Sequence, residues 1–159
     1  MRGTDALSRA RVAELMCLAD ECTIAWNPVR TFGSGAGTMS IPAASKEMIR
    51  WIHRTLGTIE SWFKDCDFTG LCEGGERGPN MAEIVLYQFL EFTKDCYGKD
   101  MTVGSGQKVV DVNGREAIEE FPKLAEFYDA FKTRPSAVRD LAAGEVAGDQ
   151  ALKAMQTWA

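Results

Sequence analysis

The side chains best suited to chemistry in this chain are its single histidine, His53, and its five cysteines. An imidazole can act as a general base or a metal ligand, and thiols bind zinc or act as nucleophiles. No Cys-x-x-Cys pair occurs, so a zinc site is not expected. We interpret the cysteines as reduced thiols, some buried on helices, in a cytoplasmic or other reducing compartment, with organelle targeting left open. His53 is interpreted as a surface or hydrogen-bonded residue and not as a catalytic base. The cysteines are Cys17, Cys22, Cys66, Cys72 and Cys96.

Two glycine-rich segments invite comparison with phosphate-binding loops. The first is GSGAG at 33–37 and the second is GSGQK at 104–108. A phosphate-binding loop follows a strand and carries a lysine at a fixed spacing from its glycines. The first segment follows a helical pattern and has no such lysine, and the second has neither the preceding strand nor the full spacing. We therefore expect neither segment to bind phosphate.

Asn80 and Glu83 are two polar residues at the start of an otherwise apolar run, NMAEIVLYQFLEF. Their spacing fits a capping box, in which the Asn80 side chain accepts from the first turn and Glu83 reaches back to the Asn80 N–H. A helix that is apolar on nearly every face belongs in the middle of a bundle. We assign Asn80 and Glu83 to folding, and we predict no catalytic residue and no metal ligand.

The composition is that of an ordinary soluble globular protein. The chain has 159 residues, of which 45% are hydrophobic and 26% charged, and its net charge is −5. This length predicts one domain over 1–159. The acidic balance argues against a nucleic-acid partner. No apolar run of about 18 residues is present, so no transmembrane segment is predicted.

Hydrophobic periodicity predicts most of the helices. A first amphipathic helix covers 5–27 and ends at Asn27-Pro28, because a residue before proline is disfavoured in a helix. A Gly/Ser-rich loop then covers 28–44. A second helix covers 45–65, with Ser45 as its N-cap, and a third begins after Asn80.

The segment after Gly98 is predicted either as a long loop or as a short hairpin around the valines 109, 110 and 112. A helical pattern returns at 116–120 and continues to Arg134-Pro135. An extension at 144–159 is expected to form a last helix, since its apolar residues would otherwise face solvent. The predicted fold class is an all-α helical bundle of about five to six helices. Those apolar residues are Val146, Leu152, Met155 and Trp158.

Two motifs carry a family resemblance, NMAEIVLYQFLEF and EEFPKLAEFYDAFKTRPSA. Over residues 8–142 the chain resembles the C-terminal helical domain of cytosolic glutathione transferases, whose buried central helix begins with a capping box and whose later Phe/Tyr-Pro helix ends in Arg-Pro. The family's thioredoxin-like domain, which holds the glutathione site, has no counterpart here. The glycine-rich loop after the first helix is also longer than expected. The resemblance therefore implies the fold without a complete active site.

The resemblance also implies four pocket candidates, because in the family the corresponding helices wall the apolar co-substrate pocket. Met16 and Tyr128 lie on apolar faces that equally predict core packing. Trp26 either closes a cleft or packs inside the bundle. Asp20 either reaches glutathione bound in a neighbouring subunit or is simply solvated.

Three functions are compatible with these observations. The first is a non-catalytic structural or protein–protein interaction module, a subunit of a larger assembly or a homodimer, with Phe32, Phe68 and Trp158 as possible contact anchors. The second is the C-terminal half of a glutathione transferase, either a fragment or completed in trans, which conjugates glutathione to apolar electrophiles; glutathione is a cofactor only in this case. The third is a carrier of an apolar ligand.

Overall fold

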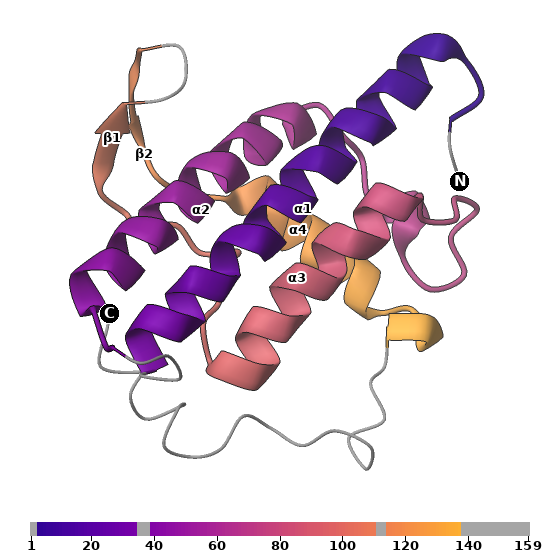
Figure 1. The fold of residues 1–159 in the computed structure, drawn as a ribbon. Coiled ribbons are helices and arrows are strands. Elements are labelled where there is room, and N and C mark those ends of the chain that lie inside the picture. The colour runs from indigo at the N-terminus through magenta and orange to yellow at the C-terminus, as the bar shows by residue number, and fades with distance from the viewer. Residues whose placement is uncertain (1–2, 35–38, 111–113, 138–159) are drawn as a thin grey trace.

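The computed structural model describes residues 3–34, 39–110 and 114–137, and these are mostly helical (Figure 1). This agrees with the predicted all-α class, with one small sheet added. The described residues form four α-helices, two short 3₁₀ turns (η1 and η2) and two strands. In chain order they are α1 (Ala6–Ser34), α2 (Pro42–Phe63), η1 (Thr69–Leu71), α3 (Met81–Tyr97), β1 (Lys108–Val110), β2 (Glu116–Ile118), α4 (Pro122–Lys132) and η2 (Pro135–Ala137).

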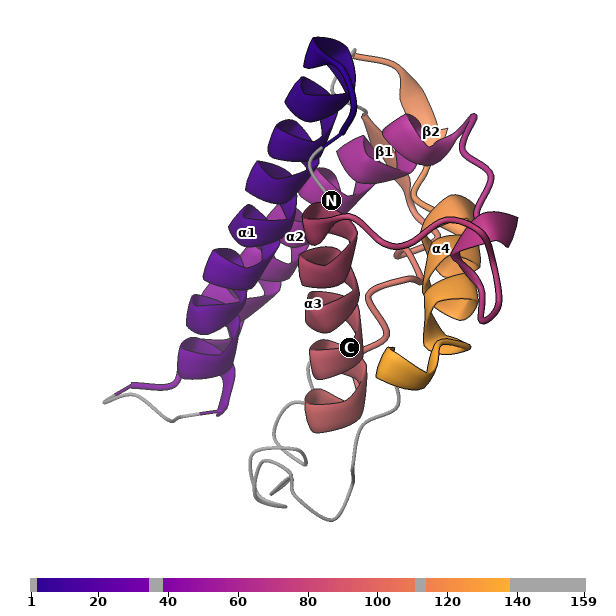
Figure 2. The same ribbon diagram turned by 90° about the vertical axis from the view of Figure 1, so that its right-hand side faces the viewer.

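The helices pack around one hydrophobic core. α1 lies against both α2 and α3, and Figure 2 shows α4 on the opposite side of the molecule from α1. The buried positions of α1 recur every three or four residues, which is the helical period of a core-facing stripe. Trp26 in this stripe meets Phe89 and Tyr97 of α3 edge-on, at ring-centre distances of 6.4 and 5.3 Å. The stripe consists of Leu15, Ala19, Cys22, Trp26 and Val29.

α1 does not end at Asn27-Pro28 as the sequence predicted, because it continues through Pro28 to Ser34. A proline inside a helix removes one backbone hydrogen bond. Packing holds the following turn in place here, since Val29 is fully buried and its carbonyl accepts a 2.9 Å hydrogen bond from the Ser45 hydroxyl of α2. The predicted loop over 28–44 is correspondingly shorter.

Ser45 is not the N-cap of α2. The helix begins three residues earlier, at Pro42, and proline suits this first position because its missing N–H would have no helical partner. The N–H of Ile41 donates to the carbonyl of Phe32 at 2.8 Å and holds the start of α2 beside the end of α1. The Ser45 hydroxyl therefore links α2 to α1 and does not cap a helix end.

Between α3 and α4 the structure has a hairpin, one of the two alternatives that the sequence left open. β1 and β2 are antiparallel, and Val109 pairs with Ala117 at the centre of the register. The helix predicted over 116–120 is wrong, because the backbone groups of this segment pair with β1 and not with a helical turn. The last predicted helix, in the extension at 144–159, lies outside the described residues.

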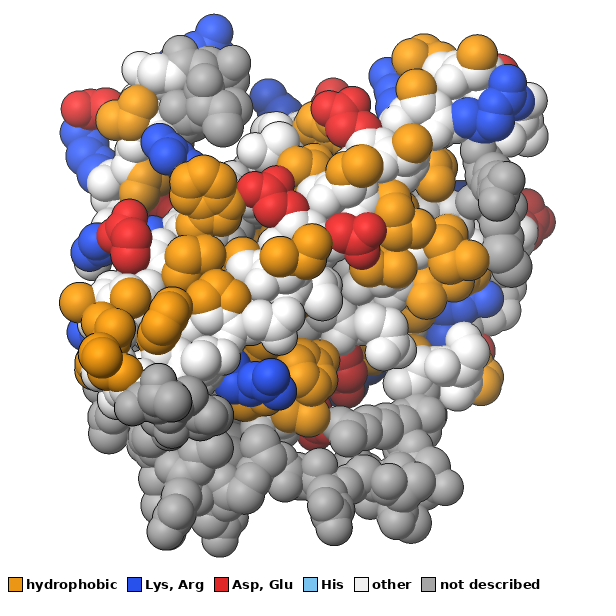
Figure 3. Space-filling model, viewed as in Figure 1, with side chains coloured by type: hydrophobic (Ala, Val, Ile, Leu, Met, Phe, Trp, Pro, Cys, Tyr) orange, Lys and Arg blue, Asp and Glu red, His pale blue; other side chains and the backbone are white. Residues whose placement is uncertain are grey.

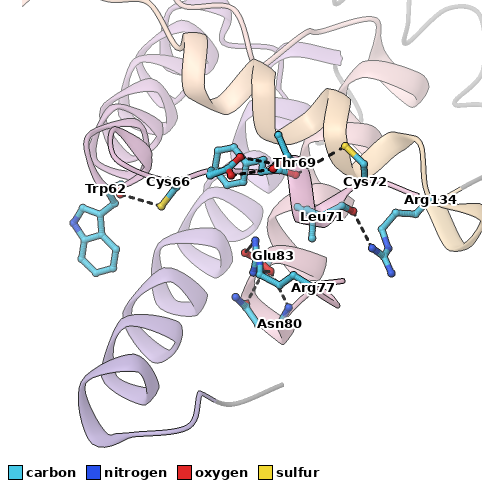
Figure 4. Close-up of polar contacts among 11 residues, drawn as sticks. Trp62, Cys66, Thr69, Leu71, Cys72, Arg77, Asn80, Glu83 and Arg134 are labelled. Carbon is cyan, nitrogen blue, oxygen red and sulfur yellow. Dashed lines mark hydrogen bonds and ion pairs between the residues drawn. The ribbon is translucent and has the colours of Figure 1, made fainter. Parts of the chain in front are cut away.

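The loop before α3 is folded against the core. Phe68, expected as a possible contact anchor, is buried and packs edge-on against Phe63 and Phe127 at 5.0 and 5.5 Å. Arg134, which follows α4, donates to the Leu71 carbonyl of η1 at 2.8 Å (Figure 4). Phe32 is only partly buried, and Trp158 lies outside the described residues.

Both hydrogen bonds of the capping box are present at the start of α3. The Glu83 N–H donates to Asn80 Oδ1 at 3.0 Å, and the Asn80 N–H donates to Glu83 Oε2 at 2.8 Å. Glu83 is buried and is also held by both terminal nitrogens of Arg77, as Figure 4 shows. Through Arg77, Glu83 therefore holds the loop before α3 as well as the first turn of the helix.

We predict that Asn80→Ala lowers the free energy of unfolding by about 1 kcal/mol, the usual effect of losing an N-cap side chain. Urea unfolding followed by circular dichroism measures this change. Asn80→Asp is the matched control and should retain most of the stability, because its carboxylate can accept the same hydrogen bond. If Asn80→Ala instead abolished partner binding in a fully folded protein, the assignment of Asn80 to folding would be wrong.

Candidate groove between α2 and the hairpin

A groove of about 1100 Å³ lies between α2, the segment that follows α3, and the hairpin. Figure 1 shows the hairpin standing away from the helices beside α2. One wall is formed by the face of α2 that carries Arg50 and Arg54, and the other by the hairpin residues Val110 and Ile118. Phe121 and the segment at 99–107 complete the lining. This is the concave surface that we consider as the functional site.

His53 and Glu119 join the two sides of the groove. His53 Nδ1 and Glu119 Oε2 lie 2.9 Å apart, and their side chains are only 14% and 13% exposed. The Ser105 N–H donates to the same carboxylate oxygen at 3.2 Å, and the His53 ring meets Phe121 edge-on at 5.7 Å. Burial raises the pKa of Glu119, but the hydrogen bonds from Ser105 and His53 outweigh burial and leave this pKa below its ordinary value. His53 is thus a hydrogen-bonded residue.

The second glycine-rich segment, GSGQK, surrounds Glu119. The Gly106 N–H donates to the Glu119 carbonyl at 3.1 Å, and the Glu119 N–H donates to the Gln107 carbonyl at 2.9 Å. A Cβ at Gly104 would lie 2.0 Å from the Glu119 carbonyl oxygen, so only glycine fits this close approach. The segment that resembles a phosphate-binding loop therefore holds a carboxylate-bearing residue of its own chain.

A carboxylate that orients an imidazole is also a known catalytic arrangement. Here the Glu119 carboxylate binds the Ser105 backbone as well, and the His53 ring packs on Phe121, so both groups join the hairpin base to α2. Sequence reasoning named His53 but missed Glu119. The one available signal was the glycine-rich segment beside the valines of β1, which marks a close approach of backbone.

The groove lining carries charges of both signs. Its carboxylates are Glu47, Glu60, Asp100, Glu119 and Glu120, and its cations lie mainly on α2. Lys46, Arg50 and Arg54 are exposed at every fourth position of α2, and Lys99 adds a further cation to the lining. Arg50 pairs with Glu47 of its own helix at 3.0 Å, whereas no described group pairs with Lys46, Arg54 or Lys99. Burial lowers the pKa of Lys99, and the neighbouring positive charge of Lys46 lowers it further.

The hairpin side of the groove is apolar. Val110 and Ile118 are 57% and 51% exposed, and Val103 of the lining segment is 61% exposed. Trp51 of α2 is also half exposed, and its Nε1–H donates to Glu21 of α1 at 2.8 Å, which fixes the indole at the groove edge. Exposed apolar side chains beside unpaired cations are typical of a surface that another molecule covers.

The four pocket candidates named from the resemblance lie away from this groove lining. Trp26 and Tyr128 are buried in the core, Met16 is partly buried against it, and Asp20 is exposed on α1. Tyr128 stacks on Tyr87 at 5.6 Å and donates its hydroxyl to Glu91 at 2.5 Å. Burial and the adjacent Glu91 carboxylate raise the pKa of the Tyr128 phenol. Trp26 and Tyr128 are therefore both used in core packing.

Among residues 3–34, 39–110 and 114–137, no group of three or more His, Cys, Asp or Glu side chains is placed to hold a metal ion. The five cysteines are unbonded to one another, and burial raises the pKa of the Cys22 thiol to about 12. None of the described helices has the length and apolar character needed to cross a bilayer. Comparison with family models, curated proteins and solved structures found no match. The resemblance to the glutathione transferase domain stays a prediction from the two sequence motifs.

We predict that Glu119→Gln destabilises the fold by about 1 kcal/mol at neutral pH, because it removes charge-assisted hydrogen bonds at the hairpin base. The pKa of Glu119 is lowered on folding, so the advantage of the wild type over the variant is full above the ordinary value of 4.5. It should disappear as the pH falls through the lowered pKa. Urea unfolding at a series of pH values between about 7 and 3 measures the difference.

The control for this variant is Glu116→Gln, which removes an exposed carboxylate paired with Lys108 on the same hairpin. This change should leave stability almost unaltered, since exposed ion pairs contribute little. Equal effects of the two substitutions, or a difference from the wild type that does not depend on pH, would contradict the role given to Glu119.

Proposed function

We propose that the chain is a non-catalytic protein–protein interaction module of glutathione transferase-like fold that serves as a subunit of a larger assembly. The observation that carries this proposal is the groove between α2 and the hairpin, whose lining combines charged side chains of both signs with exposed apolar side chains. The fold assignment rests on the two sequence motifs. Their counterparts here are the capped α3 and the α4 segment that ends at Arg134-Pro135.

The hairpin gives the groove a form suited to binding. Its base is fastened to α2 by the His53–Glu119 pair and to the segment before β1 by the close approach of Gly104 to Glu119, while Val110 and Ile118 remain exposed. A site whose walls are fixed before binding loses less conformational entropy when a partner docks. Protein interfaces combine apolar contacts with charged and polar ones.

Site-specific photo-crosslinking in the native cells tests the proposal. A photoreactive amino acid at position 118 should give one discrete crosslinked polypeptide, and native mass measurement should place both chains in the same stoichiometric assembly. The same group at Gln88, which is exposed on α3, is the matched control and should give no such product. Identical products from both positions, or recovery of the chain alone, would contradict the proposal.

A second candidate function rests on a different surface. Figure 3 shows hydrophobic side chains gathered over the N-terminal half of α1 and the start of α3. Leu7 and Met81 are exposed on these two helices, and Met16 and Ile84 are partly buried there. A separate thioredoxin-like protein docked on this face would complete a glutathione transferase, which conjugates glutathione to apolar electrophiles.

Glutathione-agarose retention from a native extract distinguishes the two functions. A transferase completed in trans should be retained together with its partner, and Met81→Glu should abolish that retention while leaving the isolated chain folded. An interaction module that uses the groove should pass through the resin. In that case Met81→Glu and the wild type should behave alike.

A further inference from the structure

A β-bulge at the base of the hairpin fixes the pattern of backbone hydrogen bonds between its strands. Gly106 and Gln107 together lie opposite Glu119: the Gly106 N–H donates to the Glu119 carbonyl at 3.1 Å, and the Glu119 N–H donates to the Gln107 carbonyl at 2.9 Å. Gly106 has a φ of +67°, the left-handed conformation that glycine adopts at the first position of such a bulge. Beyond this point, hydrogen-bonded and non-hydrogen-bonded pairs alternate along the antiparallel strands.

This alternation leaves polar backbone groups along the outer edge of β2. Ala117 and Val109 occupy the next hydrogen-bonded position of the register, so Glu116 and Ile118 lie in non-hydrogen-bonded pairs. The N–H and C=O groups of Glu116 and Ile118 therefore point away from β1. No described group hydrogen-bonds them on that side, and all three residues of β2 are exposed. A strand edge of this kind is a template for pairing with another chain.

An extended backbone matches the spacing of these groups. Alternate residues of a strand lie about 7 Å apart and point their N–H and C=O groups to the same side. A strand laid beside β2 can therefore hydrogen-bond Glu116 and Ile118 together. A helix uses its backbone groups internally and has none to offer at this interval. The backbone of the hairpin thus selects an extended segment as the occupant.

The side chains of β2 indicate which extended segment fits. Glu116 and Ile118 lie on one face of the hairpin, and Ile118 is 51% exposed. An added strand places one side chain beside Glu116 and, two residues along, one beside Ile118. Opposite charges and apolar β-branched residues are the favourable neighbours across strands. The exposed ion pair of Glu116 with Lys108, at 2.6 Å, leaves the carboxylate able to accept a second cation.

A second copy of the chain fits this edge less well than a partner. When two β2 strands pair antiparallel about Ala117, Glu116 of each copy lies opposite Ile118 of the other. That arrangement sets a charged group against an apolar one at both positions, without the favourable pairs named above. Charged residues on an open strand edge are also a common barrier to self-pairing.

We propose that the outer edge of β2 binds an extended segment of a partner protein by strand addition, with a basic residue of that segment beside Glu116 and an apolar residue beside Ile118. Backbone hydrogen bonds supply the affinity in this mode of recognition, and alternate side chains supply the specificity. The added strand completes a three-stranded sheet on the bundle. The inference rests on the proposed function and names how the partner binds.

Proline substitutions on the two edges of the hairpin test it. Ile118→Pro removes an outward N–H of β2 and leaves the pairing with β1 in place, because proline is tolerated where a strand N–H faces solvent. Lys108→Pro does the same on β1 and is the matched control. In the assembly recovered from native cells, Ile118→Pro should reduce the bound partner about tenfold, and Lys108→Pro should leave it unchanged. Ile118→Ala, which keeps the N–H, should have a smaller effect.

Peptides test the same edge in the unmodified chain. A synthetic strand of about eight residues carries a lysine and a valine two positions apart, to lie beside Glu116 and Ile118. When it binds, hydrogen exchange followed by NMR should slow at the amides of Glu116 and Ile118. N-methylation of the two peptide nitrogens that face β2 should weaken binding about tenfold or more. N-methylation of the two nitrogens that face away is the control and should not.

Four results would overturn the inference. They are equal losses with Ile118→Pro and Ile118→Ala, an equal loss with Lys108→Pro, a peptide that slows no exchange at Glu116 and Ile118, and equal binding of the two methylated peptides. A chain that is a dimer in sedimentation velocity and becomes a monomer with Ile118→Pro would also overturn it, because a second copy then occupies the edge. If strand addition fails while position 118 still crosslinks to a partner, the proposed function stands.

Discussion

Glu119 joins the hairpin to the helical bundle, and the shape of the groove depends on that join. Its carboxylate binds His53 of α2 and the Ser105 backbone, while its own backbone pairs with Gly106 and Gln107. Without these contacts a two-stranded hairpin of three residues per strand would have little to hold it in one place, because isolated hairpins are marginally stable. The position of the apolar wall therefore depends on the contacts that Glu119 makes.

The other wall is fixed by the core. α2 packs against α1, and Lys46, Arg50 and Arg54 are exposed at every fourth position along it. The Ser45–Val29 hydrogen bond extends this packing through the turn after Pro28. The buried positions of α2 and its exposed cations thus lie on different faces of the same helix.

Sequence reasoning predicted the features that depend on neighbouring residues. The apolar periods located α2, α3 and α4, and the Asn80-x-x-Glu83 spacing predicted a cap whose two hydrogen bonds are present. Sequence reasoning failed where contacts between residues far apart in the sequence determine the local structure. Pro28 was expected to end α1, but the helix continues because Val29 is buried in the core. A helix was expected over 116–120, but this segment forms a strand in which Ala117 pairs with Val109. Glu119 gave no local signal, because its partners lie on α2 and on the segment before β1.

Hydrogen exchange of the chain, free and within the assembly recovered from its own cells, tests the central claim most directly. The account predicts that assembly slows exchange in the hairpin and in the adjoining segment at 103–107, while the exposed face of α1 is unaffected. Slowed exchange confined to α1 and the start of α3, with the hairpin unchanged, would contradict the claim that the groove is the interaction site.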